Sequence, residues 1–138
     1  MSELFEITSI AAKDQYTVML VNANDEPLLD KAGDQLSVTV FGPGSKAYAK
    51  ATAARTQRLL DRMAKKGKSK LTAEDQINEN AEFLATITVS FSGWVYKGGA
   101  DAASILAAYK DSEIGFITEQ VQKASGDWAN FSASAVTS

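Results

Sequence analysis

Apolar and polar positions alternate in the first third of the chain. In residues 36–41, Leu36, Val38 and Val40 share one face, and this period of two predicts a half-buried strand. Residues 16–21 are rich in apolar and β-branched side chains and predict a second strand. Because two strands alone are marginally stable in water, we expect a β-hairpin or small antiparallel sheet that packs against helices.

After residue 43 the apolar positions recur every three or four residues, which is typical of helices. The pattern predicts four helices, over residues 46–66, 73–91, 102–109 and about 112–128. Thr72 and Asp101 precede the second and third helices and are their predicted N-caps. Residues 86–91 also have strand propensity, so helix and strand both stay open there.

These elements indicate an α+β fold with a mainly helical bundle of four helices after the sheet. The length of 138 residues favours a single domain. We expect this domain to span residues 1–131, with residues 1–43 β-rich and residues 44–131 helical. The small polar residues 132–138 are predicted to form a flexible tail.

Composition removes several kinds of chemistry. The sequence has no Cys and no His, which excludes disulfides, thiolate nucleophiles, His-based catalytic relays and Cys/His metal sites. Carboxylates are present, but no spacing places two of them across a cleft. We therefore predict neither an enzyme nor a cofactor or metal site.

The chain gives no sign of membrane insertion. Its N-terminus is acidic and lacks the basic and apolar regions of a signal peptide. No apolar run approaches the roughly 18–20 residues that cross a bilayer. We expect a protein that does not contact membranes.

Charge is unevenly distributed. The net charge is −5 over residues 1–43, +8 over residues 44–70 and −6 over residues 71–138. The basic residues of the middle segment fall largely on one side of its helix: Arg55, Arg58, Arg62, Lys65 and Lys66. A solvated face is the commoner explanation of such a stripe. As a binding surface, the stripe fits an acidic protein better than nucleic acid, because the sequence pI is about 4.9 and no aromatic residue interleaves the stripe.

The last third of the chain concentrates aromatic residues, which form cores or binding hot spots. Trp128 and Phe131 lie near the end, and we expect them to be exposed anchors for a partner. Gln120 is predicted to bond backbone groups of the loop around Gly98. The predicted core members in this region are Trp94, Tyr109, Phe116, Ile117 and Val121.

Together these residues form an ordered pattern. Gly93-Trp94 precedes a short loop with Gly98-Gly99, and a helix ending at Tyr109 follows. The final segment reads Y-x-D-x(4)-F-I-x-E-Q-V-x-x-A-x-x-D-x-x-N-F, from Tyr109 to Phe131. This order resembles the tail assembly chaperones of long-tailed bacteriophages, over about the last third of the chain.

The resemblance implies a protein of the host cytoplasm that binds the tape measure protein, keeps it soluble and recruits tail tube subunits. Such a chaperone is displaced during assembly and absent from the mature virion, and we expect it to form a homo-oligomer. Two alternatives stay open. One is a structural tail or head–tail joining protein of the virion, and the other is a nucleic-acid-binding regulator that uses the basic stripe.

Overall fold

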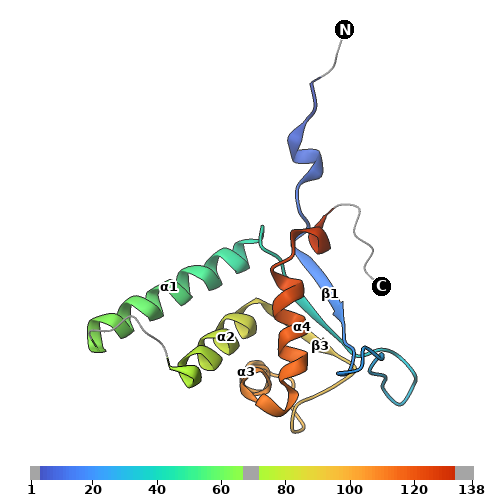
Figure 1. Ribbon diagram of the computed structural model, residues 1–138. Coiled ribbons are helices and arrows are strands. Elements are labelled where there is room, and N and C mark those ends of the chain that lie inside the picture. The colour runs from blue at the N-terminus through green and yellow to red at the C-terminus, as the bar shows by residue number, and fades with distance from the viewer. Residues whose placement is uncertain (1–3, 67–71, 133–138) are drawn as a thin grey trace.

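The computed structural model describes residues 4–66 and 72–132, which form a three-stranded sheet and four α-helices (Figure 1). The predicted α+β class is confirmed. The elements in chain order are η1 (Ile7–Ile10), β1 (Gln15–Met19), β2 (Ser37–Phe41), α1 (Lys46–Lys66), α2 (Ala73–Ile87), β3 (Thr88–Ser92), α3 (Ala102–Lys110), η2 (Ser112–Ile114), α4 (Gly115–Ser125) and η3 (Trp128–Phe131), where η marks a short 3-10 helix.

The sheet is antiparallel with the order β1-β2-β3. Val18 faces Val38, and Val38 faces Phe91 on its other side. The two predicted strands are confirmed. The third strand decides the choice between helix and strand that stayed open for residues 86–91. The helix α2 ends at Ile87, and the β-branched residues that follow pair with the free edge of β2.

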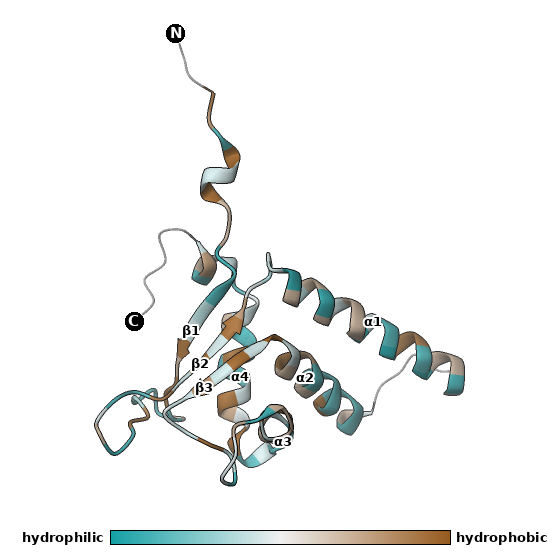
Figure 2. Ribbon diagram, turned by 180° about the vertical axis from the view of Figure 1, so that it is seen from behind, coloured by the Kyte–Doolittle hydropathy of each residue, from teal (hydrophilic) through white to brown (hydrophobic). Residues whose placement is uncertain are grey.

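The helices cover one face of the sheet, and Figure 2 views the opposite face, which no helix of the described residues crosses. The core lies between the sheet and α2, α3 and α4. Its fully buried aliphatic members include Val38 and Val40 of β2, Leu84 of α2 and Val121 of α4. Alternation in β2 points both valines inward, as their spacing predicted.

Most of the predicted core residues of the last third are buried. Tyr109, Ile117 and Val121 belong to the core. Trp94 and Phe116 are only half-buried and pack against its edge. Trp94 stacks on the Phe91 ring and donates its indole N–H to a backbone carbonyl of β2, which fixes the chain after β3.

The predicted caps are present. The Thr72 hydroxyl accepts from the Asp75 N–H and the Asp75 carboxylate accepts from the Thr72 N–H, so α2 begins with a capping box. Asp101 caps α3 in the same position. The predicted last helix is shorter than expected, because Gly126 ends α4 and the carboxylate of Asp127 caps the separate η3.

Candidate functional site

The arginines of the basic stripe are turned toward α2. Arg55, Arg58 and Arg62 share a face of α1, as predicted, but this face packs beside Glu79 of α2. Glu79 is only 8% exposed. The expectation of a solvated arginine face is therefore wrong for these three residues, since the helical hairpin buries part of each side chain.

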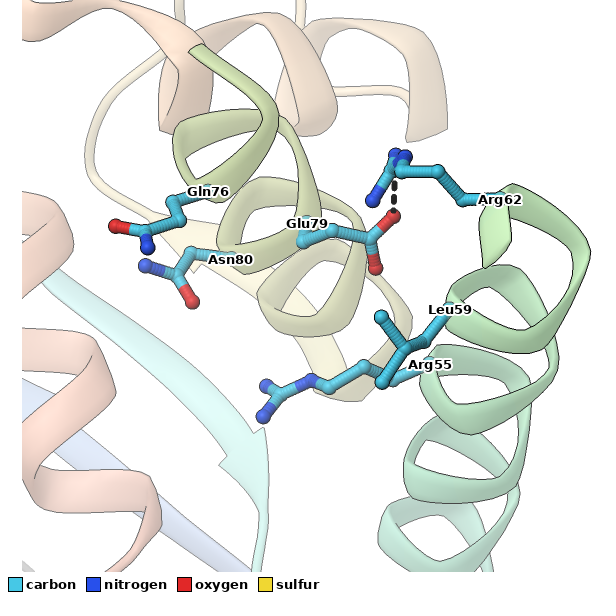
Figure 3. A pocket seen from close by; sticks show the side chains of 6 residues that line it. All are labelled: Arg55, Leu59, Arg62, Gln76, Glu79 and Asn80. Atoms are coloured by element: carbon cyan, nitrogen blue, oxygen red, sulfur yellow. Dashed lines mark hydrogen bonds and ion pairs between the residues drawn. The ribbon is translucent and has the colours of Figure 1, made fainter. Parts of the chain in front are cut away.

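The Glu79 carboxylate pairs with two of the guanidinium groups, and Figure 3 shows its contact with Arg62. The Arg58 Nε donates to both carboxylate oxygens of Glu79, at 3.1 and 3.0 Å. The Arg62 Nη2 donates to one of them at 3.4 Å. Arg55 lies with its guanidinium 3.8 Å from the centre of the Phe83 ring, which is a cation–π contact.

The pairing leaves hydrogen-bond donors unused. The Arg55 Nε, the Arg58 Nη2 and the Arg62 Nη1 are buried and have no hydrogen-bond partner among the described residues. Arg55 and Arg62 line a cleft between α1 and α2 that we call the arginine cleft; its lining residues are Arg55, Leu59, Arg62, Gln76, Glu79 and Asn80. Arg58 lines the neighbouring surface beside Asp61 and Lys65. Two guanidinium groups, those of Arg55 and Arg62, line the arginine cleft beside one carboxylate, so the cleft is cationic.

The rest of the stripe does not enter the cleft. Lys65 is exposed and lies one turn beyond Arg62. Lys66 ends α1, and its side chain lies outside the described part of the structure, as do residues 67–71. Asp61 lies beside Lys65 and accepts a hydrogen bond from Gln57 on the same helix, at 3.0 Å.

A second candidate surface was not predicted from the sequence. Residues 4–12 leave the body of the protein as an extended segment with a short 3-10 turn, η1 (Figure 1). Its large apolar side chains are exposed: Leu4, Phe5, Ile7 and Ile10. We call this segment the apolar arm. In the sequence, these apolar residues are spaced among polar ones within the short segment 4–12. A pattern over so few residues does not distinguish an exposed arm from a strand or a helix.

The arm is locally ordered. The Glu6 carboxylate caps η1 by accepting from the Thr8 hydroxyl at 2.9 Å and from the Thr8 N–H at 3.3 Å. These hydrogen bonds hold the pKa of Glu6 below its ordinary value, the hydroxyl bond being the larger cause. The base of the arm is attached to η3, because the Lys13 N–H donates to the Phe131 carbonyl at 2.6 Å.

The arm and η3 enclose a shallow open groove, lined by Ile7, Ile10, Ala11, Ala12, Trp128, Ala129 and Ser132. Trp128 is 59% exposed, so its predicted exposure is confirmed. The prediction for Phe131 is wrong, because its side chain is fully buried. The turn of η3 points Phe131 inward against the Tyr16 ring, with ring centres 5.8 Å apart.

Gln120 also has a different role from the predicted one. Its side-chain oxygen accepts from the Val21 N–H at 2.9 Å, and its amide nitrogen donates to the Val21 carbonyl at 2.7 Å and the Phe116 carbonyl at 3.0 Å. Gln120 therefore ties α4 to the chain after β1. The loop at Gly98 is instead closed by reciprocal backbone hydrogen bonds between Tyr96 and Gly99.

Hydrogen bonding and burial shift the pKa values of Tyr96, Asp111 and Tyr109. The Tyr96 hydroxyl donates to the Asp111 carboxylate at 2.8 Å, which lowers the pKa of Asp111 and raises that of Tyr96. Burial raises the pKa of Tyr109 to about 12. Among residues 4–66 and 72–132, no group of three or more acidic side chains is arranged to hold a metal ion.

A comparison of the chain with protein-family models, curated proteins and solved structures found no match. The resemblance of the last third to tail assembly chaperones therefore stays a prediction. Within the described residues, no helix combines the length and the apolar character that crossing a membrane requires.

Proposed function

We propose that this protein is a phage tail assembly chaperone that binds the tape measure protein, keeps it soluble and recruits tail tube subunits. It acts in the host cytoplasm during assembly, as a homo-oligomer, and leaves before the virion is complete. The observation that carries the proposal is the exposed apolar surface of the arm and Trp128. The sequence resemblance of residues 93–131 gives this surface its proposed client.

The quoted motif residues hold this surface in place. Asp127 caps η3 through the Ala129 N–H at 3.0 Å, and Asn130 donates its side-chain amide to the Ala124 carbonyl at 3.1 Å. Phe131 then fills the core while Trp128, on the same short turn, faces outward. The motif D-x-x-N-F therefore positions the exposed Trp128 by burying Phe131.

The chemistry of the surface suits a holding function. Exposed apolar side chains gain free energy by covering apolar stripes on another chain, at about 25 cal/mol per Å² of buried apolar area. An amphipathic helix presents such stripes at regular spacing. The arm and the groove carry no titratable side chain that the contact must neutralise apart from Glu6, which is already hydrogen-bonded within η1. Binding of this kind is reversible, as displacement by tube subunits requires.

The test is co-expression with the protein encoded by the neighbouring large coiled-coil gene, with the soluble fraction of that client as the readout. Ile10→Glu places a charge on the apolar arm and should lower the soluble fraction of the client several-fold. Leu29→Glu is the matched control, because Leu29 is 58% exposed and Ile10 is 60% exposed. Leu29 belongs to the connection between β1 and β2, at the opposite end of the sheet from the arm (Figure 1).

Both substitutions change exposed positions, so each should alter the free energy of unfolding by less than about 0.5 kcal/mol. A client that is equally soluble with and without the protein contradicts the proposal. Recovery of the protein in stoichiometric amounts from purified particles would instead identify a structural component of the virion.

A further inference from the structure

We infer that the arginine cleft is a binding site for a carboxylate group presented by another polypeptide. The inference stands on the cleft alone and does not depend on the identity of the client proposed above. It goes beyond a basic surface, because it assigns a defined pocket, a chemical group and the residues that receive it.

The charged side chains of the cleft are unequally paired. Glu79 accepts hydrogen bonds from Arg58 and Arg62, and this leaves Arg55 without an anionic partner among the described residues. Asp61, the nearest acidic side chain on α1, lines the neighbouring surface beside Lys65 and bonds to Gln57. A second carboxylate would balance the cleft.

The cleft also contains guanidinium N–H donors without a hydrogen-bond partner among the described residues. Guanidinium N–H groups that are buried without an acceptor cost free energy, and native structures contain few of them. Each of the two arginines that line the cleft has one such nitrogen: Arg55 Nε and Arg62 Nη1. Glu79 accepts from only one nitrogen of each arginine that it pairs with. Planar guanidinium groups bind carboxylates through paired N–H groups, so a second carboxylate is a suitable further acceptor for the cleft.

The shape and lining of the cleft limit what can enter it. The Phe83 ring holds the Arg55 guanidinium in place from one side. Leu59 provides an apolar wall, and the amides of Gln76 and Asn80 lie at the opposite rim (Figure 3). This arrangement admits the end of one side chain. It does not form the continuous exposed stripe that follows a nucleic-acid backbone, and the protein as a whole is anionic.

The carboxylate has two possible sources, a second copy of this chain or a different polypeptide. The first source is chemically available, because residues 1–43 carry a net charge of −5 and include the acidic Glu6 of the arm. The experiment therefore uses two labelled probes, a hexaglutamate peptide and a peptide that copies residues 1–14. Inorganic phosphate and duplex DNA serve as competitors.

Arg55→Gln is the informative variant. It removes a cationic donor from the cleft and leaves both ion pairs of Glu79 intact. Lys65→Gln removes the same charge from an exposed position of the same helix and is the matched control. We expect Arg55→Gln to weaken peptide binding by about tenfold or more, which is the scale of one charge-assisted hydrogen bond. Lys65→Gln should weaken it by less than about twofold.

Light scattering of the protein alone separates the two sources. If Arg55→Gln makes the particles smaller and the copied peptide competes, the carboxylate comes from a second copy. If particle size is unchanged while hexaglutamate binding is lost, the carboxylate comes from a different polypeptide. Equal losses in Arg55→Gln and Lys65→Gln would overturn the inference, because they would show unspecific attraction. Tighter binding of phosphate or DNA than of either peptide would overturn it as well.

Discussion

The contact between Gly42 and the Phe131 ring tests how η3 packs against the rest of the protein. A Cβ atom added at Gly42 would lie 2.6 Å from Cγ of the Phe131 ring and closer still to its edge. The ring is fully buried and has the Tyr16 ring against it, so it has little room to move away. We expect Gly42→Ala to destabilise the protein by about 1–3 kcal/mol, the usual cost of overpacking.

The effect of Gly42→Ala on the free energy of unfolding should change sign once the Phe131 ring is removed. The backbone of Gly42 is outside the left-handed region, so alanine is compatible there and restricts the unfolded chain, which stabilises by about 0.4–1 kcal/mol. Phe131→Ala alone should cost about 3–5 kcal/mol. In that background Gly42→Ala should be neutral or stabilising, which gives a coupling energy of about 1.5–4 kcal/mol between the two positions.

Urea unfolding at one fixed protein concentration measures the four free energies of this cycle. Gly115→Ala is the control, because Gly115 has helical backbone angles and no neighbour within 4 Å of an added Cβ. It should stabilise by about 0.4–1 kcal/mol. A loss of stability from Gly42→Ala that is the same with and without the Phe131 ring would refute this account of the packing.

Two further predictions concern polar groups of the core. Gln120→Ala should lower the free energy of unfolding by about 2–3 kcal/mol in urea, because it removes hydrogen bonds to Val21 and Phe116 and leaves the half-buried Val21 N–H without its acceptor; a loss below about 0.5 kcal/mol would contradict this. Tyr109 has a folded-state pKa of about 12, against about 10 in the unfolded chain. Its stabilising contribution is therefore complete below pH 10 and is lost as the pH rises toward 12. The measurable quantity is the difference in the free energy of unfolding between the unsubstituted protein and Tyr109→Phe, which should lose less stability over that pH interval. Parallel pH profiles of the two proteins would show that burial does not raise the pKa of Tyr109.

The sequence predicted the parts of the fold that local rules decide. Alternation placed Val38 and Val40 on the buried face of β2, and Thr72 and Asp101 were recognised as caps because capping depends on residues three positions apart. The boundary at Ile87 could not be predicted. Residues 86–91 have both propensities, and the choice depends on the free edge of β2, about 50 residues earlier in the chain.

The site residues show the same limit. Helical spacing correctly put the three arginines on one face of α1, but only the packing of α1 on α2 shows that Glu79 receives two of them. Phe131 is predicted to be exposed because it lies near the end of the chain, yet it is buried and packs against Gly42, which is remote in sequence. Gln120 was recognised as a buried polar group in need of partners, and its partner Val21 lies 99 residues away.

The two candidate surfaces lie apart on the molecule, and this constrains how it can assemble. The apolar arm leaves the body beside η3, whereas the arginines of the cleft lie from the middle of α1 onward, and this helix extends away from that point (Figures 1 and 2). A surface that donates apolar side chains and one that accepts a carboxylate are not self-complementary. A contact between copies through the cleft would therefore join unlike surfaces. Such a contact closes as a two-fold pair if the exchange is reciprocal, and otherwise propagates into rings or open helical arrays. If the cleft receives a carboxylate from a neighbouring copy, each added subunit brings one more apolar arm to the assembly, so the number of apolar contacts available to a long helical client grows with the number of subunits.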